Sequence, residues 1–137
     1  MTLDLQATPE EVMRAVETLQ EFAQAHGVPE KSIFGLALAL EECGSNVVNH
    51  ALEGNAEKQF QVAFEYAGGI FSIELQDAGP AFDPTAAPEG KSQAEEGDPL
   101  GGWGIQLVRN YMDKIQYQRE QERNVLRLSK RIDPAQA

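Results

Sequence analysis

The chain has 137 residues, of which 42% are hydrophobic, and its seven prolines are scattered. This length and composition predict one globular domain with a single core. Eleven Lys and Arg against 22 Asp and Glu give a formal charge of -11, which repels nucleic-acid phosphates and anionic lipid surfaces. We therefore expect neither nucleic acid nor membrane as a partner. A nucleotide ligand would need positive potential from backbone N–H groups, a helix N-terminus or a divalent cation.

Two further features concern location and redox chemistry. Residues 1–10 lack a basic start followed by an apolar run, and no segment approaches the roughly 20 apolar residues that cross a bilayer. We therefore expect a cytoplasmic protein. The single Cys43 lies among apolar residues of a predicted helix, which indicates a buried core thiol rather than a nucleophile.

The N-terminal elements carry clear local signals. Leu3 and Leu5 alternate with polar residues and predict a short edge strand. A helix is expected next, with Thr8 as its N-cap, Pro9 at its first position and Gly27 at its end.

A second helix is expected from about Pro29 to Gly54, and its middle is rich in Leu, Ala and Val. Polar residues interrupt it at helical spacing and share one face; they are Glu42, Ser45, Asn46 and Asn49. A solvated face of an amphipathic helix would explain them. A carboxylate grouped with two amides on an otherwise apolar helix also indicates a ligand or metal site. The stripe alone leaves both interpretations open.

A β-hairpin with one buried face is predicted next, because residues 60–66 and 71–75 alternate between apolar and polar side chains around Gly68-Gly69. Asp77-Ala78-Gly79 follows the second strand. An Asp there can point its carboxylate at a ligand donor, and Gly79 lets a ligand approach the backbone. The same pattern is a common turn signal.

The segment 80–99 is rich in Pro, Ala, Gly and acidic residues, as is typical of a functional lid or a disordered loop. Glycines at 101, 102 and 104 then precede a third helix, where free N–H groups and the helix dipole would cradle a phosphate, although a hinge would use glycine too. Two closing strands are expected around a polar turn at 119–123. These elements predict an α+β two-layer sandwich with helices on one face of a mostly antiparallel sheet.

Three motifs follow one another along the chain: Glu42-x-x-x-Asn46-x-x-x-His50, Asp77-x-Gly79 and Gly101-Gly102-Trp103-Gly104. In this order they resemble the nucleotide-binding domain shared by gyrase, heat-shock chaperones, histidine kinases and mismatch-repair ATPases, the GHKL superfamily. Further segments are Leu38-Ala39-Leu40-Glu41-Glu42, Ser45-Asn46, Ile105, Leu107-Val108-Arg109, Met112-Asp113 and Asn124-Val125-Leu126-x-Leu128. With these segments, the chain more closely resembles the bacterial anti-sigma-factor serine kinases of partner-switching systems.

The resemblance implies one histidine-kinase-like ATPase domain over 1–137, of the GHKL (Bergerat) two-layer type, with a mixed, mostly antiparallel sheet and a flexible ATP lid at about 83–101. It implies ATP and Mg²⁺ as cofactors. Asn46 would coordinate the magnesium ion, and Glu42 would be the general base for a serine hydroxyl. Asp77 would accept a hydrogen bond from the adenine amino group, and Gly79 would contact the ring. The remaining expected nucleotide contacts come from Asn49 and the lid glycines Gly101, Gly102 and Gly104.

Other polar or aromatic residues receive softer roles. Ser45 and Asn49 are interpreted as support for the site more than as direct ligands. We expect His50 to be structural, Glu41 to lie on the surface, and Trp103 to pack under the lid.

Two departures from the family pattern bear on catalysis. Glu122 and Arg123 stand where the family has a glycine between the last two strands. Leu100 precedes the glycine group where some active kinases have a basic residue, which leaves Lys91 and Arg109 as the nearest cationic candidates.

The leading functional interpretation is a cytoplasmic kinase that phosphorylates a serine of an anti-anti-sigma type antagonist and sequesters a sigma factor or a similar target. The alternative is a non-catalytic nucleotide-binding interaction module. A detached ATPase part of a two-component histidine kinase is less favoured, because no dimerising helical hairpin precedes the motifs. Relatives often dimerise, but a homodimer has no independent support in this sequence.

Overall fold

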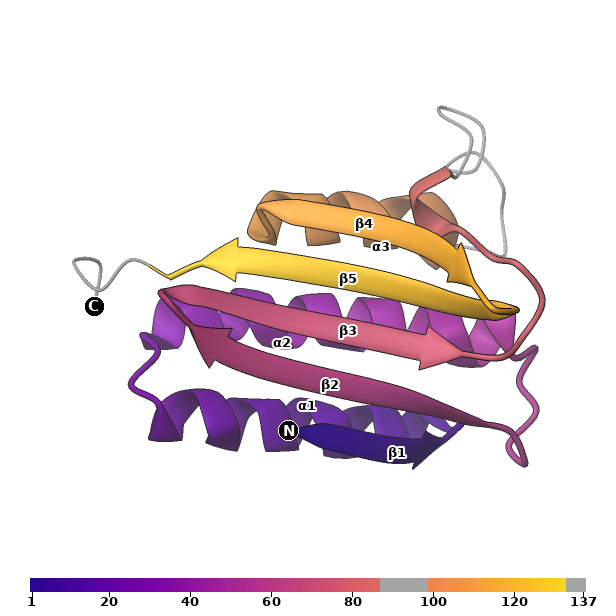
Figure 1. Cartoon of the computed structure of the whole chain (residues 1–137), viewed down its shortest axis with the longest axis horizontal. Helices are drawn as coiled ribbons and strands as arrows, with labels where there is room; N and C mark the ends of the chain where they lie inside the picture. The colour runs from indigo at the N-terminus through magenta and orange to yellow at the C-terminus, as the bar shows by residue number, and fades with distance from the viewer. Residues whose placement is uncertain (87–98, 133–137) are drawn as a thin grey trace.

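The computed structural model describes residues 1–86 and 99–132, and for 99–104 it describes the backbone alone. The elements follow one another along the chain as shown in Figure 1. They are β1 (Thr2–Gln6), α1 (Pro9–Ala25), α2 (Glu30–Asn46), a π-helical turn (Val47–Ala51), β2 (Gln59–Ala67), β3 (Ile70–Asp77), a 3₁₀ turn (Pro84–Ala86), α3 (Pro99–Tyr111), β4 (Lys114–Glu120) and β5 (Arg123–Arg131).

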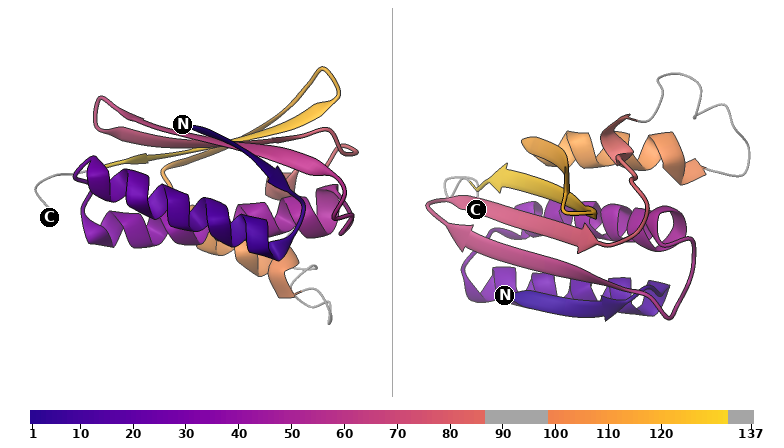
Figure 2. Two further views of the ribbon diagram at one scale, coloured as in Figure 1. Left: turned by 90° about the horizontal axis from the view of Figure 1, so that it is seen from below. Right: turned by 45° about the vertical axis from the view of Figure 1, so that its right-hand side comes forward.

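The strands form one five-stranded sheet in the order β1-β2-β3-β5-β4. All three helices cover the same face of this sheet and leave the other face open, as the left view of Figure 2 shows. The predicted α+β two-layer sandwich is confirmed. Every neighbouring pair of strands is antiparallel, so the described sheet is not mixed, contrary to the prediction. The reason is that β5 lies between β3 and β4, which run in the same direction.

The core lies between the helices and the sheet, where period-two and helical patterns bring their apolar sides together. Fully buried side chains come from both layers; among them are Leu19, Leu36, Leu40, Phe60, Phe64, Phe71, Ile73 and Leu75. Burying each such side chain stabilises the fold by about 1.5–3 kcal/mol. Cys43 is fully buried in this core, and burial raises the pKa of its thiol to about 12, so it is inert, as predicted. No helix in the described residues is long and apolar enough to cross a membrane.

The start of α1 matches its sequence signals. The Thr8 side chain accepts a hydrogen bond from the Glu11 N–H (3.2 Å), and Pro9 occupies the first helical position. Gly27, at φ +77°, follows the helix end. The edge-strand prediction is also confirmed, because β1 pairs antiparallel with β2 and Leu3 lies opposite Val62.

The second helix extends through the predicted range, but its last turn is π-helical. The N–H of Leu52 donates to the Val47 carbonyl at 2.8 Å, a five-residue spacing that adds one residue to the turn. Residues after Asn46 are therefore rotated relative to a regular α-helix. Asn49 is exposed and Ala51 is buried, an arrangement that affects the site below.

The hairpin between β4 and β5 turns at two residues, a tighter turn than the predicted 119–123 stretch. Gln121 and Glu122 have φ of 50° and 66°, as a two-residue hairpin turn with both central residues left-handed requires. Side chains with a Cβ rarely adopt this conformation, which costs about 1 kcal/mol or more. The glycine of the family pattern would relieve that strain.

We expect Glu122→Gly to raise the free energy of unfolding by about 0.5–1 kcal/mol, because glycine tolerates positive φ. Urea denaturation followed by circular dichroism measures this change. The matched control is Glu120→Gly in β4, where glycine should destabilise by a similar amount. Equal losses for both variants would show that the turn carries no backbone strain.

Candidate functional site

Polar side chains from distant parts of the sequence meet where β3 ends and β5 begins, beneath the last turns of α2. A small cavity of about 20 Å³ lies there. Its lining comes from α2, β3, β4, β5 and the segment after β3, and includes Asn46, Asp77, Phe82, Pro84, Tyr117 and Asn124. The fold therefore brings together two of the three predicted motifs.

Asp77 is the last residue of β3 and is only 2% exposed. Its Oδ1 atom accepts hydrogen bonds from the Gly79 N–H (2.8 Å) and from Asn124 Nδ2 (2.9 Å). Both hydrogen bonds that the described residues make to this carboxylate end on Oδ1. Oδ2 is therefore the oxygen that can accept a hydrogen bond from a ligand.

Asn124 is the centre of the hydrogen-bond network that holds this loop. It lies opposite Asp77 in the register of β3 and β5 and is 4% exposed. Its Nδ2 atom also donates to the Pro80 carbonyl at 2.9 Å. Its Oδ1 atom accepts from the Phe82 N–H (3.0 Å) and the Tyr117 hydroxyl (2.5 Å). Both ends of this buried amide are therefore used by the protein, so Asn124 positions Asp77 and the loop.

A close contact within the protein itself requires glycine at position 79. A Cβ placed at this residue would lie 2.4 Å from the Ala51 carbonyl oxygen, far below any real contact distance. The π-helical turn thus packs its last carbonyl directly against the loop after β3. The predicted contact of Gly79 with a nucleotide ring stays a prediction.

Phe82 and Pro84 occupy much of the space beside Asp77. The Phe82 ring stacks on the His50 ring with centroids 5.4 Å apart and planes 15° apart. The remaining volume of about 20 Å³ holds about one water molecule. This arrangement is too tight for a purine ring, so a nucleotide base fits only if Phe82 and Pro84 move outward.

Asn46 and Glu42 are more buried than residues on a solvated helix face would be. Asn46 is 5% exposed and faces the same cavity as Asp77. Glu42, one turn earlier, is half-buried, and its Oε2 atom is buried without a hydrogen-bond partner among the described residues. Burial raises the pKa of the Glu42 carboxyl above its ordinary value, and the negative charge of Glu41 raises it further. An unpaired carboxylate with a raised pKa is suited to accept a proton.

The raised pKa of Glu42 predicts a pH-dependent stability difference. A carboxyl whose pKa is higher in the folded chain than in the unfolded chain costs no stability at low pH. It destabilises the fold as the pH rises through the folded value. Glu42→Gln should therefore have a higher Tm than the wild type at pH 8, and the difference should shrink toward pH 4. Thermal unfolding at both pH values measures this, and a Glu42→Gln chain less stable at pH 8 would contradict it.

The other two polar residues of the second helix, Ser45 and Asn49, differ in how far they are buried. Ser45 is half-buried, whereas Asn49 is exposed and does not line the cavity, because the π-helical turn rotates it away from the face of Asn46. The predicted direct nucleotide contact of Asn49 stays a prediction. Glu41 is exposed, in agreement with the prediction. His50 packs on Phe82 as a structural ring would.

The glycine motif lies inside α3 and not before it, because α3 begins at Pro99. The predicted lid at 83–101 therefore overlaps the first turn of α3, and its middle, 87–98, lies outside the described residues. At the start of the lid, Asp83 Oδ1 accepts a hydrogen bond from the Thr85 N–H at 2.9 Å, which forms a local turn. Any phosphate contact by the N–H groups of Gly101 or Gly102 would come from the first turn of α3, where helix N–H groups are free, whereas the N–H of Gly104 lies beyond that turn.

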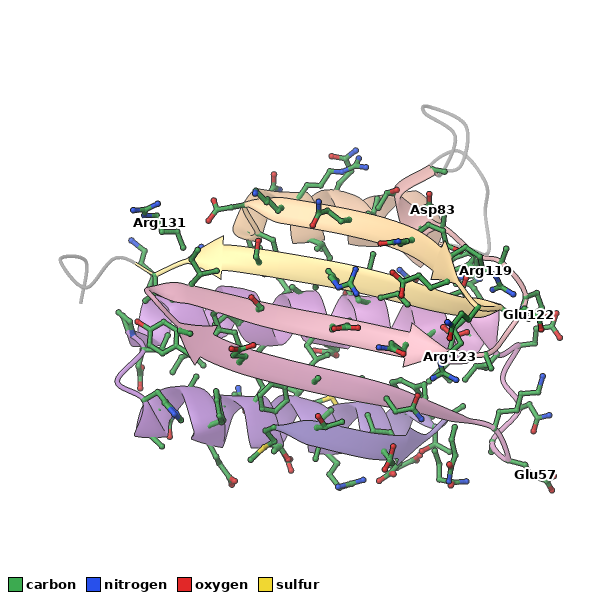
Figure 3. All side chains as sticks on the ribbon, viewed as in Figure 1. Glu57, Asp83, Arg119, Glu122, Arg123 and Arg131 are labelled. Atoms are coloured by element: carbon green, nitrogen blue, oxygen red, sulfur yellow. The ribbon has the colours of Figure 1, made fainter. Side chains whose placement is uncertain are left out.

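Cationic side chains near the site differ from those expected. Lys91 lies outside the described residues, and Arg109 donates to the Thr85 carbonyl at 3.2 Å. Arg119, which the sequence reasoning passed over, donates to the Gly79 carbonyl at 2.8 Å and to Asn124 Oδ1 at 3.1 Å. Figure 3 shows Arg119 with Glu122 and Arg123 at this end of the sheet. The hairpin register, which pairs Arg119 with Asn124, was the signal that could have located it.

The described residues contain no group of three or more His, Cys, Asp or Glu side chains that could hold a metal ion. A magnesium ion typically uses one or two protein oxygens together with waters and substrate phosphates. The buried amide of Asn46 fits that limited role. A metal bound mainly by protein side chains does not fit the described residues.

Residues 5–130 match the model of the histidine kinase-like ATPase domain, and the chain belongs to this family. Its relatives include serine/threonine-protein kinase BtrW of Bordetella bronchiseptica, 28% identical over 135 residues that cover 97% of this chain and 94% of that protein. Serine-protein kinase RsbW of Listeria innocua is 27% identical over 120 residues, 84% of this chain and 76% of that protein. The resemblance to the partner-switching serine kinases is thereby confirmed.

Solved structures support the fold. The RsbU and RsbW domains of Rv1364c from Mycobacterium tuberculosis superpose with a TM-score of 0.68 at 18% identity, covering 96% of this chain and 32% of that chain. The SiaB–SiaC complex from Pseudomonas aeruginosa gives a TM-score of 0.68 at 12% identity, covering 94% of this chain and 88% of that chain.

Proposed function

We propose that the chain is a cytoplasmic serine/threonine-protein kinase that binds Mg-ATP, phosphorylates a serine of an antagonist protein and alternates between this antagonist and a sigma factor or similar target. The observation that carries the proposal is the buried Oε2 atom of Glu42, which has no hydrogen-bond partner among the described residues. Glu42 lies one helical turn before Asn46, and Asn46 lines the cavity beside Asp77. The names of the relatives BtrW and RsbW support the same activity.

Each residue has a defined part in this proposal. Asp77 Oδ2 would accept a hydrogen bond from the adenine amino group, and Asn46 would provide an oxygen ligand to magnesium. Bound Mg-ATP supplies the phosphoryl group and neutralises charge on the phosphates. Glu42 would take the proton of the serine hydroxyl as the serine Oγ–P bond forms and the bond from the γ-phosphorus to the ADP oxygen breaks. Asn124 acts through Asp77 and is a positioning residue.

The experiment is transfer of ³²P from γ-labelled ATP to proteins in the soluble fraction of the source cells, with identification of the labelled serine by mass spectrometry. Labelling of one acceptor that requires both this chain and Mg²⁺ is expected. Absence of transfer to any protein, with ATP binding intact in calorimetry, would instead support the non-catalytic interaction module. The closely filled cavity beside Phe82 is the observation that favours this second candidate.

A further inference from the structure

An apolar strip runs over the outer surface between α2 and α3. Phe34 is 61% exposed and Leu107 is 40% exposed, although α2 and α3 both contribute buried apolar side chains to the core, such as Leu36 and Val108. The Phe34 and Tyr111 rings meet edge-on with centroids 5.9 Å apart. We define the strip as Phe34, Leu38, Leu107 and Tyr111. The Tyr111 side chain covers Gly35, where a Cβ would lie 2.8 Å from Tyr111 Cδ1.

The strip leads to Glu42. Tyr111, the last residue of α3, packs beside Phe34 near the start of α2, so the two helices run antiparallel, as Figure 1 shows. Residues 34, 38 and 42 follow at four-residue spacing along one face of α2, and 107 and 111 do the same on α3. An apolar surface of two helices therefore ends at the half-buried carboxylate whose Oε2 atom has no described partner.

The charges beside the strip indicate what it contacts. Glu41 is exposed next to Glu42, and the whole chain carries a formal charge of -11. Two copies of this chain would each carry that negative charge and repel one another, which disfavours a second copy as the occupant of the strip. A different protein with an apolar side chain and a basic residue near its hydroxyl would bury the strip and neutralise Glu41.

We propose, on the basis of the function proposed above, that the strip is the docking surface for the phosphoacceptor protein. An apolar side chain of the acceptor packs on Phe34 and Leu107, a basic side chain lies near Glu41, and the serine hydroxyl reaches Glu42. Exposed aromatic residues at the centre of an interface commonly dominate its binding energy. Docking on this strip sets the affinity for the acceptor and leaves the affinity for ATP unchanged.

The test uses steady-state phosphorylation of the purified acceptor identified by the ³²P transfer assay, with the variants Phe34→Ala, Phe34→Gln and Leu107→Ala. We expect KM for the acceptor to rise by about tenfold or more. The kcat at saturating acceptor and the Kd for ATP from calorimetry should stay within about twofold. Met13→Ala is the matched control, since Met13 is 41% exposed on α1, outside the strip. Thermal unfolding verifies that each variant is folded.

The outcomes separate the two proposals. If the wild type labels no acceptor, the proposed function fails and the docking surface fails with it. If the wild type labels the acceptor and the Phe34 variants keep its KM, the docking surface is wrong and the kinase function stands. Variants that convert a wild-type dimer into monomers without changing KM would show that the strip joins two copies, which also overturns the inference.

Discussion

Glu42→Gln is expected to lower the rate of phosphoryl transfer by about 10²–10⁴-fold, the usual contribution of a general base. The substitution keeps the size of the side chain and removes only its ability to accept a proton. ATP affinity should change little, because Glu42 does not appear among the cavity residues around Asp77 and Asn46. Single-turnover transfer to the acceptor, measured with saturating ATP, gives the rate directly.

Glu41→Gln is the matched control for this prediction, since it removes a carboxylate from the adjacent, exposed position. It should keep transfer within about tenfold of the wild type if acceptor is saturating, because Glu41 is one residue away from the reacting face. The wild-type rate should also rise with pH through the raised pKa of the Glu42 carboxyl, and this limb should vanish in Glu42→Gln. Full transfer by Glu42→Gln would exclude Glu42 as the base.

Asn124→Ala is expected to destabilise the fold by about 3 kcal/mol, since it removes a buried amide that joins several partners. The lost contacts include those to Asp77, Pro80 and Phe82. Without them, the Asp77 carboxylate and the loop after β3 lose their alignment, and ATP binding should fall below detection. Urea denaturation measures the first effect and titration calorimetry the second.

Tyr117→Phe is the matched control, because it removes one hydrogen bond of the Asn124 network and leaves the others in place. It removes only the hydroxyl that donates to Asn124 Oδ1 and should cost about 1 kcal/mol while ATP binding is kept. Asn124→Ala with the same stability as Tyr117→Phe would show that the other hydrogen bonds contribute nothing. Asn124→Ala with wild-type ATP affinity would show that Asp77 does not depend on this residue.

Much of the fold could be predicted because its signals are local. The cap at Thr8, the alternation on either side of Gly68-Gly69 and the helical period after Pro29 each depend on neighbouring residues, and each element formed as predicted. The errors also have local causes. Glycines at 101, 102 and 104 suggested a loop before a helix, but the helix begins at Pro99, because proline is a favoured residue at the first helical position.

The sequence by itself determined the elements, the order of the motifs and thereby the family, since periodicity and spacing are properties of the chain. Only the tertiary structure decided how the site is built. Asp77 and Asn124 are 47 residues apart, and Phe82 reaches His50 across the site. The π-helical turn that moves Asn49 away places the Ala51 carbonyl against Gly79. Hydrogen bonds and close contacts between distant residues depend on strand register and helix packing, which local patterns do not encode.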